Sequence, residues 1–472
     1  MMTDKDLITC VNRLIQNYKS NSLKLTDNYV EQRDFYLFLL FWYLHEANQK
    51  IAYGQQLNSS SYDEFCALLK SVKNKYPATH SLYQAVDTVM LKVATFRKDD
   101  FPKFIAESNR GFTKSFSGIS SDSFDVQTSM SLYQSLLGRL ESMNPIDHFM
   151  VEEDDYQEIP QDFIELITRL DTAKERSIKT AYFPFETVGE QCVYFAKRNP
   201  NCHLRIECLL ISPHLMRMLA LVGANSVEIT FSNSLAVDAN VKANTFDLAY
   251  TLLQPQNVNE KEKVEGGKEK KYIPIKGGFD PKRLNPDSVP ARYKENGYLQ
   301  HTQWTLSKHG VAYMIMGKGF LFRDIEAQAR EILIKKNAID SIIQLPPNLM
   351  SFCPLPLVLI ILRKTKPTKD IFYLDATEGF TADASRNRFS GFEKIVKMVT
   401  KREVILGVSA LVSPDKIKEN KYSLNPQNYL VELDNVKESS EQLDAERQEL
   451  TELLMKKKNS IDNLFKHLSK KI

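Results

Sequence analysis

The chain has 472 residues, which is long enough for two or three domains of ordinary size. Apolar residues make up 43% and charged residues 26% of the composition, a balance that excludes an intrinsically disordered chain. The net charge of +3 neither requires nor excludes nucleic acid, because basic residues can gather on one face. No apolar run reaches the roughly 18 residues of a membrane span, and the N-terminus lacks the pattern of a signal peptide. We therefore expect a cytoplasmic protein.

The cysteines and histidines give no sign of a metal site. No CxxC, HxxxH or HxH pair occurs, and in a reducing compartment scattered cysteines favour small buried hydrophobes over a disulfide or zinc role. The six cysteines are Cys10, Cys66, Cys192, Cys202, Cys208 and Cys353.

Residues 1–160 have the pattern of a helical domain. The run 33–47 is strongly apolar but too short to cross a bilayer, which predicts a buried central helix. Segments 60–73, 80–93 and 130–143 place apolar residues at helical spacing. The acidic segment 147–160 ends in a proline and suits a connection to the next domain.

From about residue 160 short β-like runs alternate with amphipathic segments such as 213–223 and 323–337. This alternation predicts an α/β fold, a mostly parallel sheet with helices on both faces. The seven β-like runs cover 179–185, 202–211, 226–231, 245–253, 310–316, 340–346 and 356–362.

Two segments are open to more than one interpretation. The charged stretch 254–292, which includes NEKEKVEGGKEKK, is either a solvated insertion or a basic loop that lies on nucleic acid. The tail from about Ser439 predicts one long amphipathic helix, which either packs on the protein itself or docks a partner subunit. Its apolar stripes repeat every eleven residues, at Leu443, Leu454 and Phe465 and again at Leu450, Ile461 and Ile472.

Segments between 297 and 389, taken in order, resemble the second half of the methylation subunits of type I restriction-modification systems, a family of N6-adenine DNA methyltransferases. KIKENKYSLNPQNYL at 416–430 resembles the family's segment before its terminal helices. The matching positions lie in a turn, at a strand end and in a later short strand: Gly317, Gly319, Leu321, Phe322, Arg323, Leu345, Pro346, Asp375 and Ala376.

The resemblance implies a Rossmann-like methyltransferase sheet of about seven strands, with an N-terminal helical domain and a C-terminal helical extension. The expected boundaries are 1–160 for the helical domain, 161–400 for the α/β domain and 401–472 for the extension. The resemblance also implies assembly with a specificity subunit or another protein through the C-terminal helix, and contact with DNA.

The family holds S-adenosylmethionine on a DPxCGxG turn after the first strand, and the corresponding stretch here is TAYFPFETVGEQ at 180–191. Pro184 and Gly189 remain, but Phe183 replaces the Asp, Glu186 the Cys and Thr187 the first Gly. A β-branched threonine disfavours the positive φ that glycine permits, and phenylalanine removes a carboxylate. The resemblance therefore implies that this cofactor turn has lost its function.

Two further cofactor positions follow from the resemblance. Glu207 lies near the end of the second strand, where the family places the acid that holds the ribose hydroxyls. Asn233 lies after the third strand, where the family has an Asp that meets the adenine. The vestigial cofactor residues are therefore predicted to be Phe183, Pro184, Gly189, Glu207 and Asn233.

The family's catalytic motif, NPPF or NPPY, orients the exocyclic amine of a flipped adenine and stacks on its ring. Aligned on Phe246 and Asp247, the motif falls on a sequence that contains neither the paired acceptors nor the aromatic. Such groups contribute roughly 10²-fold or more each to the rate. The four positions are Leu252, Leu253, Gln254 and Pro255.

Three functions stay open from the sequence. The favoured one is a catalytically inactive methylation-subunit-like protein, with no cofactor, that binds DNA or a partner as a scaffold. The second is an active S-adenosylmethionine-dependent adenine-N6 DNA methyltransferase with divergent motifs, and the third is a nucleic-acid-binding regulatory protein. A nucleophilic hydrolase is disfavoured, because neither GxSxG nor GxxxxGK[ST] occurs.

Overall fold

The computed structural model of the chain forms two units, residues 1–430 and 431–472, each of which is described by itself. In the second unit the described residues are helical, so the part of the predicted terminal helix that is described has the expected structure. The described residues are 3–21, 23–49, 61–119, 124–141, 161–172, 177–186, 190–208, 213–231, 234, 241–252, 283, 295–350, 356–366, 368–382, 386–430, 447–452 and 454–458.

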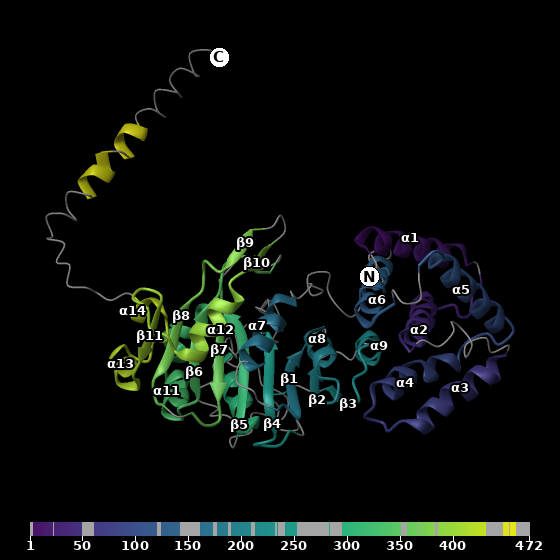
Figure 1. The fold of residues 1–472 in the computed structure, drawn as a ribbon, viewed down its shortest axis with the longest axis horizontal. Helices are drawn as coiled ribbons and strands as arrows, with labels where there is room; N and C mark the ends of the chain where they lie inside the picture. The colour runs from purple at the N-terminus through teal and green to yellow at the C-terminus, as the bar shows by residue number, and fades with distance from the viewer. Residues whose placement is uncertain are drawn as a thin grey trace, which may run out of the picture. The chain divides into compact units, whose positions relative to one another are not determined.

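The N-terminal part is helical, as expected (Figure 1). Its centre is α2, in which every residue from Phe35 to Leu44 is buried, so the apolar run at 33–47 is the predicted central helix. Asn28 caps its first turn by accepting from the backbone N–H of Val30 and Glu31. The helices are α1 (Asp4–Ser20), α2 (Tyr29–Asn48), α3 (Tyr62–Lys75), α4 (Ser81–Val93), α5 (Phe101–Ser115) and α6 (Val126–Glu141).

A nine-stranded mixed sheet forms the α/β part, in the order β11-β8-β6-β7-β5-β4-β1-β2-β3. Strand β7 is antiparallel to both of its neighbours, and β11 is antiparallel to β8. The seven predicted runs are β1 to β7. The strands are β1 (Thr180–Glu186), β2 (His203–Cys208), β3 (Ser226–Phe231), β4 (Phe246–Leu252), β5 (Leu306–Gly317), β6 (Ile339–Gln344), β7 (Leu357–Arg363), β8 (Ile371–Asp375) and β11 (Ser409–Val412).

The α/β prediction is confirmed, and the sheet has nine strands where about seven were expected. Both additional strands lie at one edge of the sheet. Strand β11 has only four residues and its Leu411 is exposed, so it carries no run of apolar residues long enough to predict a strand. A separate two-stranded hairpin pairs β9 (Phe380–Ala382) with β10 (Asn387–Phe389).

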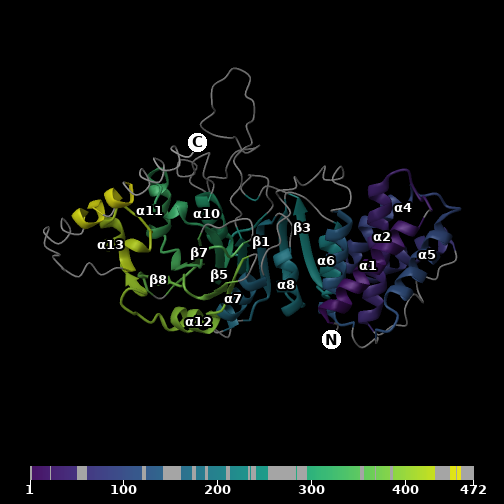
Figure 2. The ribbon, with the colours of Figure 1, turned by 90° about the horizontal axis from the view of Figure 1, so that it is seen from above.

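Helices cover both faces of the sheet (Figure 2). One face shares its core with α7 (Gln161–Thr172), α8 (Glu190–Arg198), α9 (Pro213–Leu221) and α12 (Phe392–Lys401). The other shares its core with α10 (Glu295–Thr305), α11 (Ala327–Lys335), α13 (Pro414–Glu419) and α14 (Gln427–Leu430). Two short 3₁₀ turns, Lys318–Leu321 and Asp324–Glu326, lead from β5 into α11.

A buried ion pair joins the N-terminal helices to the α/β part. Arg217 of α9 is fully buried, and its Nη1 lies 2.7 Å from Oδ1 of Asp34 in α2. The same guanidinium donates to the hydroxyl of Tyr133 in α6 at 3.3 Å. Burial works against both charges, but the pair keeps the pKa of Asp34 below and that of Arg217 above the ordinary value. Residues 1–430 are thus one compact unit, and the boundaries at 160 and 400 remain predictions.

Candidate functional site

Ligands of open α/β sheets bind at the carboxyl ends of the parallel strands. Phe183 and Pro184 on β1, Glu207 on β2 and Leu252 on β4 all lie toward this edge, since β2-β1-β4 are neighbouring parallel strands. The structure therefore brings the described part of the predicted site together. Five predicted residues lie outside the described part of the chain: Gly189, Asn233, Leu253, Gln254 and Pro255.

Phe183 belongs to the hydrophobic core. The side chain is fully buried, and its ring centroid lies 5.5 Å from that of Phe195 in α8 and 6.2 Å from that of Tyr250 in β4. Both pairs are edge-to-face, the arrangement that aromatic rings prefer. The position where the family has a carboxylate thus holds a packed ring that faces away from the α10 side of the sheet.

The chain turns at Phe185 with a left-handed backbone, φ +62°. A non-glycine residue in this region costs about 1–2 kcal/mol, which surrounding contacts must offset. The Phe185 ring lies 4.1 Å from the ring of Tyr298 in α10, and the carbonyl of the preceding Pro184 accepts from Oγ1 of Thr251 at 3.1 Å. The end of β1 is therefore held in place by an aromatic contact and a hydrogen bond.

Glu207 is fully buried and both of its carboxylate oxygens are engaged. Oε2 accepts from the hydroxyl of Tyr182 at 2.6 Å, and Oε1 lies 3.4 Å from Nη2 of Arg205. Arg205 also contacts the carboxylate of Glu228 on β3, so its charge is shared between two acids. The acid predicted to hold a ribose is thus part of an internal polar network.

This network continues into α10 and was missed by sequence reasoning. The Tyr182 hydroxyl lies 2.7 Å from Nε2 of His301, and Nδ1 of His301 lies 3.5 Å from Nη1 of Arg283. Burial, and then the charge of Arg283, lower the pKa of His301 to about 3, so its ring is neutral at pH 7. Because Tyr182 donates to Glu207, His301 must donate to Tyr182 through Nε2 and accept from Arg283 through Nδ1.

Arg283 is nearly fully buried beside this network. Its guanidinium lies 5.6 Å from the ring centroid of Trp304 in α10, within cation–π range, and it donates to the carbonyl of Ser234 at 3.2 Å. Burial and the Glu207 carboxylate raise the pKa of Tyr182, which keeps its hydroxyl protonated. The side chains of Glu207, Tyr182, His301 and Arg283 therefore form one continuous polar chain.

Leu252, the described member of the predicted catalytic motif, is buried at the end of β4 and is in register with Ile315 of β5. An aliphatic side chain has no atom that could accept a hydrogen bond from an adenine amine. Phe183 and Glu207 likewise do not offer the contacts through which the family motif holds S-adenosylmethionine. The described residues of this edge thus do not fit that cofactor as the motif binds it.

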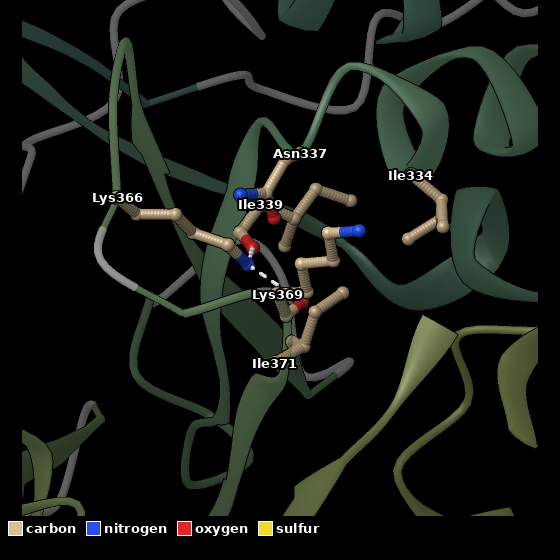
Figure 3. A pocket seen from close by; sticks show the side chains of 6 residues that line it. All are labelled: Ile334, Asn337, Ile339, Lys366, Lys369 and Ile371. Atoms are coloured by element: carbon tan, nitrogen blue, oxygen red, sulfur yellow. Dashed lines mark hydrogen bonds between the residues drawn. The ribbon is translucent and has the colours of Figure 1, made fainter. Parts of the chain in front are cut away.

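Other kinds of site are sparse in the described residues. No group of three His, Cys, Asp or Glu side chains there is placed to hold a metal ion. A shallow pocket lined by Ile334, Asn337, Ile339, Lys366, Lys369 and Ile371 lies at the amino ends of β6 and β8, the edge opposite the predicted site (Figure 3).

None of the helices that the structure describes is both long and apolar enough to cross a membrane.

The family described as N-6 DNA Methylase matches residues 216–439. A type I restriction enzyme methylase subunit of Mycoplasma pneumoniae is 30% identical over 146 residues, which cover 30% of this chain and 27% of that protein. One from Methanocaldococcus jannaschii is 25% identical over 294 residues, 59% of this chain and 47% of that protein. The matched parts thus span between about a quarter and half of these relatives.

Solved structures share the fold. The type I restriction-modification methyltransferase subunit from Streptococcus thermophilus superposes with a TM-score of 0.61 at 18% identity, covering 91% of this chain and 99% of that one. A modification subunit of a putative type I restriction enzyme from Vibrio vulnificus gives 0.56 at 14% identity, covering 88% and 94%. The chain thus has the fold of these methyltransferase subunits. It is a relative of the type I restriction-modification methylation subunits.

Proposed function

We propose that this chain is a methylation-subunit-like component of a type I restriction-modification type system that does not transfer methyl groups and acts as a DNA- or partner-binding scaffold. The fold and the family support the first part of the proposal. The second part depends on the carboxyl edge of the sheet, where the predicted cofactor and catalytic residues lie.

The observation that carries the proposal is the state of Glu207. A ribose-binding acid needs at least one oxygen that a ligand can reach, but this carboxylate has no exposed surface and bonds to Tyr182 and Arg205. Releasing it for a ligand would leave the buried Tyr182 hydroxyl without its acceptor and would remove one of the two acids that Arg205 contacts, at a cost of about 1–3 kcal/mol or more. Phe183 and Leu252 support the same conclusion, because neither carries a polar atom.

A partner would bind through the C-terminal helix in this proposal. Among the described residues of the second unit, Leu450, Leu454 and Met455 are each at least 60% exposed, and their spacing of four and five residues keeps them on neighbouring faces of a helix. An apolar surface of this kind favours burial against another protein. Cytoplasmic location is part of the same proposal.

The first test is calorimetric titration of the full chain with S-adenosylmethionine and S-adenosylhomocysteine. We expect no heat of binding and no rise in melting temperature at about 1 mM ligand, since saturating ligand would otherwise add at least a few kcal/mol of stability. A cooperative melting transition in the same samples serves as the control that the protein is folded.

Micromolar binding of both ligands would overturn the proposal and favour the active methyltransferase with divergent motifs. Methyl transfer to unmethylated adenine-containing DNA would then be measured directly. Absence of ligand binding would direct the search toward a protein that co-purifies through the C-terminal helix.

A further inference from the structure

Basic residues from four separate chain segments meet at the edge of the sheet opposite the predicted cofactor site. The four segments are the amino end of β5, the residues from the end of α11 to β6, the residues from the end of β7 to β8, and the carboxyl end of α12. We call this surface the basic edge, and its nine basic residues are Lys308, Lys335, Lys336, Arg363, Lys364, Lys366, Lys369, Lys401 and Arg402.

Hydrogen bonds tie the segments of the basic edge together. The backbone N–H of Lys364 donates to the carbonyl of Gly310 at 3.2 Å, and Nδ2 of Asn337 donates to the carbonyl of Thr368 at 3.3 Å. Nη2 of Arg402 donates to the carbonyl of Asp370 at 2.8 Å. The four segments therefore form one surface of the folded protein.

The positive charges of the basic edge lie close to one another. Nζ of Lys366 is held by the carbonyls of Ile339 at 2.5 Å and of Lys369 and Asp370 at 3.2 Å each (Figure 3). Burial lowers the pKa of Lys366 to about 8. The charges of Arg402 and Arg363 act in the same direction, whereas the carboxylates of Asp340 and Asp370 oppose the shift. Burial and the charge of Lys336 lower the pKa of Lys364.

Acidic residues balance only part of this charge. Asp340 lies 3.3 Å from Arg363 and 3.2 Å from Arg402, and Glu331 lies 2.7 Å from Lys335. The helices α10, α11 and α12 end at this edge, and each helix terminus adds about half a negative charge. Four exposed lysines are in no ion pair with any residue that the structure describes: Lys308, Lys336, Lys369 and Lys401.

We propose that the basic edge binds the phosphate backbone of duplex nucleic acid. Lysine ammonium groups on several loops suit phosphates as point charges, and such contacts need no particular sequence. Exposed apolar side chains begin directly after the basic edge, at Val404, Ile405 and Leu406. The choice of nucleic acid over an acidic protein therefore depends on the exposed lysines, and the test separates the two. The inference is independent of the proposed loss of methyl transfer.

The test is fluorescence anisotropy of a labelled mixed-sequence duplex of about 30 base pairs with the full chain at several salt concentrations. The variant replaces at once the four exposed lysines that are in no ion pair with a described residue, K308Q, K336Q, K369Q and K401Q. We expect Kd at low salt to rise at least about tenfold, and the slope of log K against log salt to fall by about 3 to 4, close to 0.9 for each lost phosphate contact.

A matched variant controls for the change of net charge. It replaces four exposed lysines of the N-terminal helices, K19Q, K70Q, K103Q and K114Q, and should bind the duplex within about twofold of the unmodified protein. Equal losses in the two variants, or no binding of the duplex at about 50 mM salt, would overturn the proposal. Displacement of the duplex by polyglutamate at equal charge would assign the surface to an acidic protein instead.

Discussion

The two edges of the sheet differ in how far their charged side chains are buried and paired. At the carboxyl edge the charges of Glu207 and Arg205 are buried and paired inside the protein. At the basic edge nine cationic side chains outnumber acids such as Asp340, Asp370 and Glu331, and five of the lysines are exposed, four of them in no ion pair with a described residue. A charge that is satisfied internally stabilises the fold and is withdrawn from ligands, whereas an exposed surplus is available to a partner. The edge where a methyltransferase cofactor would bind is thus the one with fewer charged groups that a ligand can reach.

The largest effect is expected at Glu207. Glu207→Leu removes the acceptor of the buried Tyr182 hydroxyl and one partner of the buried Arg205, so we expect a loss of about 3–5 kcal/mol in the free energy of unfolding. Urea unfolding followed by circular dichroism measures this change. The melting temperature should fall with it.

Glu228→Gln is the matched control, because Glu228 contacts the same Arg205 from a half-exposed position. An exposed partner of this kind contributes about 1 kcal/mol or less. Equal destabilisation by the two substitutions would show that the carboxyl edge is not organised around Glu207, and the contrast between the two edges would then fail.

A smaller effect is expected from the acid dependence of stability through His301. Its folded pKa of about 3 lies below the unfolded value, so its contribution is present above about pH 6.5 and is lost as the pH falls toward 3. Between pH 6.5 and 4.5 the neutral ring should account for about 2–3 kcal/mol of lost stability. His301→Gln should therefore reduce the acid sensitivity by that amount, as measured by urea unfolding at each pH.

The neighbouring His309 is exposed and supplies the control. His309→Gln should leave the acid sensitivity unchanged within about 0.5 kcal/mol, the range expected for surface substitutions. If both variants retain the full acid dependence, the neutral His301 between Tyr182 and Arg283 is not the group that titrates, and the proton arrangement of the network is wrong.

The sequence predicted β1 to β7 because most of them are apolar runs buried on both faces, such as β7, where six of seven residues are buried. It also predicted the central helix α2 from its uninterrupted apolar run. The edge strand β11 could not be predicted, since its four residues are held mainly by pairing with β8. The spacing of apolar residues indicates which side chains are buried. It does not predict a short strand that is stabilised mainly by pairing with a strand distant in the sequence.

The site was only partly predictable. The resemblance indicated the positions of Phe183, Glu207 and Leu252, and in the structure all three lie toward the carboxyl edge of the sheet. It could not indicate that Tyr182 reaches His301, because these residues are 119 positions apart and tyrosine and histidine are ordinary core residues. The pairing that engages Glu207 is a tertiary contact, and a motif comparison of single positions does not contain it.

The smallest effect is expected at Lys366 of the basic edge. Lys366→Met removes three hydrogen bonds to carbonyls but also the burial of a charge, so we expect the free energy of unfolding at pH 7 to change by no more than about 1–2 kcal/mol.

Because the folded pKa of Lys366, about 8, lies below the unfolded value, stability rises with pH between about 8 and 10.5 in the unmodified protein. The Met variant should lack this rise, and Lys369→Met, at an exposed position, should keep it. A rise of equal size in both variants would mean that Lys366 is not held as a buried cation.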